Sequence, residues 1–470
     1  MGRALRTVDV DAGRGAALRL VAGASLREVL DPGDPCAWLA LDLGVRAPHH
    51  VLGYRTGPVR PELSAGTDEP GLALALCHRD GRTRGRALDL AAGRPSLLPL
   101  VAVRATDWAE PVRERAREVL SAGLDTDAAV LLAPLVLLLG RRDRGAFAVD
   151  LLARVLREAP TERLRALLGH TDHAVRRFAH RIAVEQGRLS PSELARAAAG
   201  DPDTVVKRMC ADAAVSACGT EPAVLDVLLA ARDPQVRSSG VTALRRAGLP
   251  ERAEAFLTDR AAVVRACARY VVRQYGGDPA AWYRARCAGP HGGELSPGAV
   301  VGLAECGDRA DAALLWPLVA HPVAAVRARA VAGLRLLDTA DARRMEPLLE
   351  DAAPGVVREV TAALLPSARS LDPERLAGLL AADRPRHQRV AGFRLLEACG
   401  GLTRLRAAVA LLDDPDGKLR TWAGQSVQGW HATSDVPLGT AEVGELLERA
   451  GHLFSDFVLA RRKREAGLPG

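Results

Sequence analysis

The apolar positions of this chain recur with a helical spacing, and one unit of the pattern shows this most clearly. The unit runs from Asp201 to Ala214 and has a basic residue, Lys207, near its centre. Val206, Cys210 and Ala214 stand at −1, +3 and +7 from that basic residue. Because these offsets share one face of an α-helix, the unit predicts an amphipathic helix with its small and apolar side chains turned inward.

The same unit returns in register along most of the chain. The basic position falls at residues 84, 113, 144, 176, 207, 237, 265, 296, 327, 358, 389 and 420, and all of these except residue 296 are Arg or Lys. The +7 residue is apolar in every unit, and the +3 residue is small in all but one, which marks a structural repeat. The segments between these units, such as 221–230 and 402–412, supply partner helices. The sequence therefore predicts an all-α fold, an α-solenoid of about twelve helical hairpins.

Asp-Pro pairs at 201, 233 and 414 precede three of the repeat helices. An Asp in this place accepts a hydrogen bond from a free backbone N–H, worth roughly 1 kcal/mol, and Pro suits the first helical position. We therefore predict that these Asp residues are helix N-caps. Two units are degenerate: Phe147 takes the small position after Arg144, and Ser296 replaces the basic residue in a Gly/Pro-rich stretch, 276–298.

The repeat sets the predicted domain boundaries at 1–68, 69–435 and 436–470. The first segment is predicted to be an N-terminal cap, with short helices at 15–30 and 35–45 and an irregular loop from 46 to 70. The last segment is predicted to be a C-terminal capping helix, 442–465, followed by a tail. Its basic end, residues 461–464, suits a helix C-terminus, where the helix dipole favours cations.

The Asp-Pro…Val-Arg…Ala…Leu units resemble the HEAT-like repeat family, especially the short, roughly 30-residue repeats of the phycobilisome lyase type. The resemblance covers residues 70–435. It implies an armadillo/HEAT-like superhelix in which the Asp and Arg of successive repeats bond to one another as an internal ladder. It leaves function open, because such arrays serve as scaffolds, adaptors, lyase subunits and nucleic-acid readers.

The amino-acid composition indicates the cellular compartment of the protein more clearly than it indicates a function. Arg and Lys outnumber Asp and Glu, 64 to 57, which is compatible with nucleic-acid binding, but many Arg occupy the fixed repeat position. The eight cysteines form no C-x-x-C pair, so we expect reduced thiols in a cytoplasmic protein. The longest apolar run, 128–139, contains Pro134 and is shorter than the about 20 residues of a membrane span, and no N-terminal signal sequence is indicated.

Motifs of catalysis and cofactor binding are missing from the sequence, and we expect neither a cofactor nor a metal. Cys287, His291 and Cys306 match no zinc template, and residues 49 and 50, both His, lack a third ligand. The stretch 414–417 lacks the later ligands of a calcium loop. Asp107-Trp108 resembles a pair found in HEAT-type DNA glycosylases, but nothing else matches that family's site, and we favour a capping Asp followed by an aromatic residue at a hairpin turn.

The positions +1, +5 and +8 of each unit are predicted to face outward, on the concave surface. In the middle repeats they form a basic band: Arg177, Arg181, Arg208, Arg245, Tyr270 and Arg273. We expect this band to bind an acidic amphipathic helix of a protein partner, which makes the chain a non-catalytic scaffold or adaptor. A merely solvated basic face, a nucleic-acid-binding protein and an accessory subunit of a lyase remain as alternatives.

Overall fold

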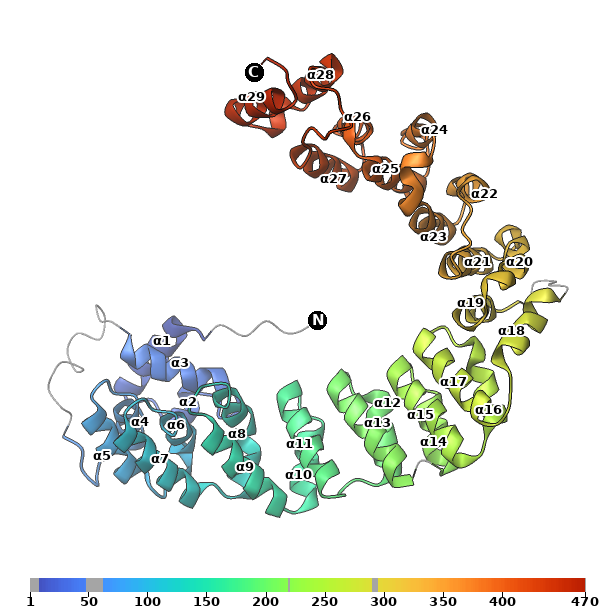
Figure 1. Cartoon of the computed structure of the whole chain (residues 1–470). Coiled ribbons are helices and arrows are strands. Elements are labelled where there is room, and N and C mark those ends of the chain that lie inside the picture. The colour runs from blue at the N-terminus through green and yellow to red at the C-terminus, as the bar shows by residue number, and fades with distance from the viewer. Residues whose placement is uncertain (1–7, 48–61, 219, 290–294, 470) are drawn as a thin grey trace. The chain divides into compact units, whose positions relative to one another are not determined.

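Helices are the regular elements of the described chain, which comprises residues 8–47, 62–218, 220–289 and 295–469 of a computed structural model (Figure 1). The chain forms two units, Met1–Gly240 and Val241–Gly470, and the boundary falls within helix α15. Within each unit the helices pack as consecutive hairpins. The prediction of an all-α fold built from helical hairpins is confirmed.

Three helices precede the repeats of the first unit: α1 (Val10–Val21), α2 (Leu26–Val29) and α3 (Pro35–Arg46). Helices α1 and α3 cross with their backbones in contact, since a Cβ on Gly13 would lie 1.8 Å from the Ala40 carbonyl oxygen. The helix predicted at 35–45 is confirmed. The one predicted at 15–30 is two helices, because the chain turns at Gly23, whose φ of 94° suits glycine. Most of the predicted loop, residues 48–61, lies outside the described residues.

The hairpins of the first unit each pair a first helix with a second helix, which carries the repeat unit found in the sequence. The first helices are α4 (Glu69–Leu76), α6 (Leu98–Arg104) after the 3-10 turn η1 (Pro95–Leu97), α8 (Thr126–Leu139), α10 (Thr161–Leu168), α12 (Pro191–Gly200) and α14 (Pro222–Leu229). The second helices are α5 (Gly81–Ala91), α7 (Glu110–Gly123), α9 (Ala146–Glu158), α11 (His173–Glu185), α13 (Thr204–Cys218) and α15 (Pro234–Ala247).

The second unit continues the same plan with shorter first helices. These are α16 (Pro250–Glu254) with η2 (Ala255–Thr258), α18 (Pro279–Ala288), α20 (Ala312–Leu315) between η3 (Arg309–Asp311) and η4 (Pro317–Ala320), α22 (Ala342–Met345) with η5 (Glu346–Glu350), α24 (Pro373–Gly378) after η6 (Leu365–Ser370), and α26 (Gly401–Ala410). Their partners are α17 (Ala262–Gln274), α19 (Pro297–Cys306), α21 (Ala324–Leu336), α23 (Pro354–Leu364), α25 (Arg386–Cys399) and α27 (Gly417–Gln428). In the described residues the two units hold twelve hairpins, as predicted.

The chain's last segment is two helices joined by a turn, α28 (Ala441–Arg449), η7 (Gly451–Leu453) and α29 (Asp456–Glu465). The single helix predicted over 442–465 is wrong. Helix α28 ends before Gly451, and Ser455 begins a new helix from the extended conformation typical of an N-cap. Both residues are poor for helix interiors, and the prediction passed over them.

The repeated basic residue donates hydrogen bonds to carbonyl groups of the loop that precedes its own helix. Nine of the twelve aligned positions are the fourth residue of a second helix. In Arg176, Nη1 donates to the carbonyls of His170 and Thr171 at 2.7 and 3.1 Å, and Arg327 does the same to residues 321 and 322. These carbonyls lie in the tight turn of the hairpin, so the arginine supplies donors that the turn itself lacks.

Three positions of the sequence alignment were wrong. Arg144 lies in the turn before α9, and Ser296 is the N-cap of α19, so the fourth residues of those helices are Val149 and Val300. Arg358 is the fifth residue of α23, with 69% of its side chain exposed. There, two valines precede the arginine, and aligning on the basic residue shifted the register by one.

The predicted ladder between successive repeats is confirmed. Arg84 reaches Asp107 of the next hairpin, Arg176 reaches Asp201, Lys207 reaches Asp233, Arg327 reaches Asp351, and Arg389 reaches Asp414. Arg265 instead pairs with Glu305, which also binds Arg269. Each rung joins one hairpin to the next, so the ladder orders the stack.

The predicted capping role of the Asp-Pro pairs holds at one site and is wrong at two. Asp233 accepts from the Gln235 N–H, and Pro234 is the first residue of α15. Asp201 and Asp414 each accept from the N–H of the Asp two residues later. That second residue, Asp203 or Asp416, is the one that caps its helix. The first Asp therefore does not cap the helix and instead pairs with the arginine of the preceding hairpin.

The core consists of small and aliphatic side chains, as the composition predicts. The +3 residues Ala87, Ala116, Cys210, Ala330 and Ala423 are all fully buried. Their small size lets a neighbouring helix approach closely. In the first unit the buried residues form two clusters, one ending at Ala183 on α11 and one beginning at Leu194 on α12. None of the described helices is long and apolar enough to cross a membrane.

Candidate partner-binding groove

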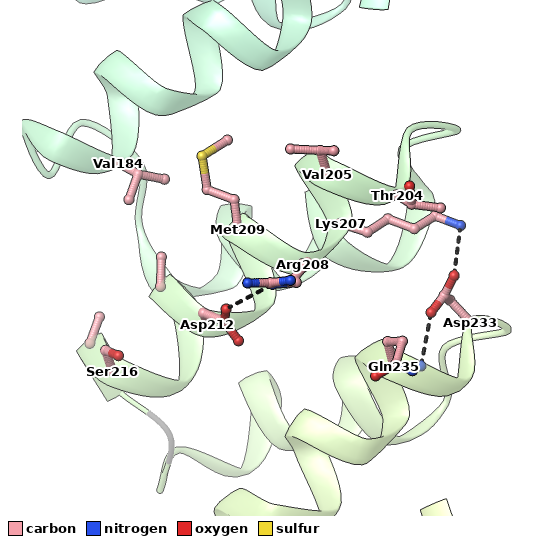
Figure 2. A pocket seen from close by; sticks show the side chains of 12 residues that line it. Val184, Thr204, Val205, Lys207, Arg208, Met209, Asp212, Ser216, Asp233 and Gln235 are labelled. Carbon is pink, nitrogen blue, oxygen red and sulfur yellow. Dashed lines mark hydrogen bonds and ion pairs between the residues drawn. The ribbon is translucent and has the colours of Figure 1, made fainter. Parts of the chain in front are cut away.

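A groove of about 1230 Å³ runs along the solvent-exposed face of α13, between the end of α11 and the start of α15 (Figure 2). All its lining residues belong to the first unit. Helix α13 is fixed beneath it, because Val206, Cys210 and Ala214 are fully buried and Asp203 caps the helix start. The groove therefore presents side chains from a helix whose position is set by the repeat.

The floor of the groove is apolar. Val205, with 45% of its surface exposed, and half-buried Met209 and Ala213 follow one another at four-residue spacing along α13. Val184 of α11 faces this stripe from the other side, as Figure 2 shows. Residues four apart lie one above another on a helix, so this is a continuous apolar strip open to solvent. The sequence pattern had assigned only +1, +5 and +8 to the exposed face and so missed it.

The charged residues of the groove are partly matched to each other. Lys207 Nζ lies 3.5 Å from Asp233 Oδ2, which is its rung of the ladder. Arg208 lies beside the strip with 82% of its side chain exposed, and its Nε is 3.9 Å from Asp212 Oδ2. Such an exposed pair contributes little and is easily exchanged for another partner. Arg208 is thus the cation of this groove that an incoming carboxylate can reach.

Arg177 and Arg181, the two arginines of the predicted basic band that lie on α11, have different roles. Arg177 binds Asp203 through two parallel hydrogen bonds of 2.9 and 2.8 Å. The Arg177 hydrogen bonds and charge, with the N–H groups of Val206 and Val205, hold the pKa of Asp203 at about 2 against the opposing effect of burial. Arg177 is therefore occupied by the fold. Arg181 is exposed and stands one turn before Val184, on the same side of α11 as the groove.

The remaining three predicted residues belong to the second unit. Arg245 Nη1 donates to Tyr270 Oη at 2.6 Å, and its guanidinium lies 5.6 Å from the centre of that ring. Tyr275 Oη in turn donates to the Arg245 carbonyl at 2.6 Å. Arg273 is exposed on α17. Arg245 and Tyr270 thus form a cluster of their own, distinct from the groove on α13.

Asp107 and Trp108, the pair weighed as a glycosylase-like site, have separate environments. The Asp107 side chain is 1% exposed, and it binds Arg84, Arg104 and the Ala109 N–H. Burial raises the pKa of this carboxyl, but the hydrogen bonds from Arg84 and Ala109 and the Arg104 charge outweigh it and lower the pKa. Trp108 is 67% exposed. The predicted capping role of Asp107 is wrong, because the N-cap of α7 is Ala109, whose N–H donates to Asp107. Asp107 instead holds the ladder, and its carboxylate is enclosed by its partners.

Metal-binding and redox groups do not converge in the described part of the chain. No cluster of three or more His, Cys, Asp or Glu residues there could hold a metal ion. All eight cysteines are free thiols, and burial raises the pKa of Cys210 to about 12 and of Cys287 to about 11. His291, His49 and His50, considered as ligands from the sequence, lie outside the described residues.

No protein-family model and no curated protein matches the chain. Among solved structures, the E. coli protein YibA is 14% identical with a TM-score of 0.25, and the match covers 59% of this chain and 96% of that one. The karyopherin Kap121p is 13% identical with a TM-score of 0.26, covering 88% of this chain and 50% of that one. A TOG domain array of microtubule polymerases is 11% identical with a TM-score of 0.24, covering 75% and 99%.

These likenesses are too slight to say what the chain binds or to which repeat subtype it belongs. The helical-hairpin repeat rests on the chain's own helices and ladder. The relation to phycobilisome lyase-type repeats stays a prediction.

Proposed function

We propose that this chain is a non-catalytic, HEAT-like scaffold that binds a protein partner through the solvent-exposed face of α13. The observation that carries the proposal is the exposed strip formed by Val205, Met209 and Ala213, with Arg208 beside it. A contiguous exposed apolar strip beside polar residues is typical of an interaction site, and an accessible cation beside it gives the covering segment a preferred charge.

The occupant we propose is an amphipathic helix of another protein, with apolar residues on one face and carboxylates at its margin. Its apolar face would cover Val205 and Met209, in the manner of a helix lying in a groove. Its carboxylates would pair with Arg208 and Arg181, because Arg177 and Lys207 are already taken by Asp203 and Asp233. Arg245, Tyr270 and Arg273 extend this proposal as a second contact region on the second unit.

The experiment is site-specific photo-crosslinking from position 205 of the full chain, with the captured peptide sequenced by mass spectrometry. The expected product is an acidic amphipathic segment of one protein, and its yield should fall at least fivefold in the double variant Arg181→Glu, Arg208→Glu. Leu131, 48% exposed on α8 of the same unit, is the matched control position for the crosslinker. Capture that is equal from both positions, or unchanged by the charge reversals, would contradict the proposal.

A further inference from the structure

A cluster of arginines lies near the turns of the first hairpins, away from the groove on α13. Its members come from four places in the first unit: Arg46 at the end of α3, Arg84 on α5, Arg104 at the end of α6, and Arg142 in the turn after α8. Two buried carboxylates, Asp42 and Asp107, lie among them. The sequence offers no sign of this cluster, since its residues are up to 100 positions apart.

The two carboxylates are shared among the guanidinium groups. Asp42 Oδ1 lies 3.0 Å from Arg46 Nε and 2.5 Å from Arg104 Nη2. Asp107 lies 2.7 Å from Arg84, 2.9 Å from Arg104 and 3.7 Å from Arg46. Arg142 donates to the Thr106 hydroxyl at 3.4 Å and acts electrostatically on Asp42. The groups therefore form one electrostatic unit.

The cluster carries two more positive than negative charges, since four guanidinium groups face two carboxylates. Arg46 Nη2 and Arg104 Nε are buried without a hydrogen-bond acceptor in the described residues, whereas Arg46 Nε faces Asp42 Oδ1 as an ion pair. Arg142 as a residue is exposed, but packing around its guanidinium lowers its pKa, and the neighbouring Arg104 charge adds to this against the attraction of Asp42. An excess of partly buried charge is unfavourable unless a counter-charge is present.

The excess charge is accessible from one direction. The Arg84, Arg104 and Asp107 side chains are at most 3% exposed, whereas 23% of the Arg46 side chain is exposed and Arg142 is open to solvent. Arg79 adds a cation at the same place, because its Nε and Nη2 donate to the Arg46 carbonyl at 2.9 and 2.6 Å. Arg46 and Arg142 are therefore the members of the cluster that an anion can reach.

We propose that this cluster is a binding site for a phosphate group, held by Arg46 and Arg142 and backed by Arg104. A phosphate monoester carries about −1.5 to −2 charges near neutral pH and therefore offsets more of the excess than a single carboxylate would. The planar guanidinium also pairs with phosphate oxygens through two hydrogen bonds at once. The site is independent of the protein-binding groove and goes beyond the scaffold function.

The test is isothermal titration calorimetry of the full chain with inorganic phosphate at constant ionic strength in chloride. Wild type should bind phosphate with one-to-one stoichiometry, and Arg142→Gln and Arg46→Gln should each weaken binding at least tenfold. Arg82→Gln, which alters an exposed arginine on α5 with no contact to Asp42 or Asp107, should bind like wild type. Thermal unfolding in chloride checks that the variant Arg142→Gln, whose substitution is at an exposed position, is folded.

Two further titrations distinguish the source of the phosphate. Tighter binding of adenosine monophosphate than of inorganic phosphate identifies a phosphate ester as the ligand. Tighter binding of a 12-nucleotide single-stranded DNA, with an affinity that falls steeply with salt and is lost in Arg142→Gln, identifies a nucleic-acid backbone. The proposal is overturned if none of the three probes binds wild type, or if Arg142→Gln and Arg46→Gln bind them as tightly as Arg82→Gln does.

Discussion

Arg84 and Asp107 face each other with both side chains shielded from solvent, and Nη2 and Nε of the arginine lie 2.7 and 2.9 Å from the two carboxylate oxygens. The pair joins the first hairpin to the second. Arg84 also holds the carbonyls of His78 and Arg79 in its own turn. One residue thus fixes a turn and the neighbouring repeat together, which explains why the basic position recurs through the chain.

Replacing Asp107 with alanine should destabilise the first unit strongly. The change leaves the buried guanidinium groups of Arg84 and Arg104 without their carboxylate, and breaking such a pair costs about 3–5 kcal/mol. The measurement is the free energy of unfolding in urea. Asp89→Ala, which removes a 59% exposed carboxylate from its pair with Arg115, is the control and should cost about 0.2–1 kcal/mol. Equal losses for the two variants would show that the ladder does not hold the stack.

Asp203 should make stability depend on pH between about 4 and 2. Its pKa in the folded chain is about 2, against 3.8 ordinarily, so the unfolded chain takes up the proton first as the pH falls. The Arg177–Asp203 pair therefore stabilises the fold fully above pH 4 and loses this effect towards pH 2. Asp203→Asn keeps a capping side chain but removes the charge, and should cost about 1 kcal/mol at pH 7.

Urea unfolding of wild type and Asp203→Asn at pH 7, 5, 4 and 3 measures this effect. The difference in unfolding free energy should be constant from pH 7 to 5 and shrink below pH 4. A difference that stays the same down to pH 3 would mean that Asp203 acts only as a helix cap.

Glu305 should be as important to the second unit as Asp107 is to the first. It binds Arg269 Nη1 at 2.6 Å and Arg265 Nε at 3.1 Å, and both arginines are buried. Burial raises the pKa of Glu305, but its two arginine partners outweigh this and lower the pKa. We expect Glu305→Ala to lower the unfolding free energy by about 3–5 kcal/mol.

Glu374→Gln, an exposed change on α24, is the control for Glu305→Ala and should stay within about 0.5 kcal/mol of wild type. Hydrogen exchange of α17 and α19 would locate the effect. If those helices exchange in Glu305→Ala as slowly as in the control, Glu305 is not a rung of the stack.

The repeat made the fold predictable from the sequence, and the errors arose where local chemistry departs from it. Small residues at +3, apolar residues at +7 and the basic residue were found because they recur in most of the hairpins. The register failed at Arg358 because two valines precede it. The split of the C-terminal segment at Gly451 was missed because Gly451 and Ser455, which are poor residues for a helix interior, were not taken as a helix break.

The candidate groove was predictable only in part. Arg208 was identified because the repeat does not need it, and the structure places it beside the groove. Val205 and Met209 gave no signal, since an exposed aliphatic residue looks like a core residue in the sequence. That Arg177 is occupied by Asp203 also could not be foreseen, because the pairing depends on how two hairpins stack.

The central claim, that the α13 groove holds an acidic amphipathic helix, predicts a charge-specific affinity. The direct measurement is fluorescence anisotropy of the peptide captured from position 205, titrated with wild type, Arg208→Glu and the control Arg154→Glu, which changes an exposed residue of α9. The account predicts that Arg208→Glu weakens binding about tenfold, roughly 1.4 kcal/mol, and that the control binds like wild type. It also predicts that replacing the peptide's facing carboxylate with lysine restores binding to Arg208→Glu. Equal affinities for all three proteins, or no restoration by the lysine peptide, would contradict the account.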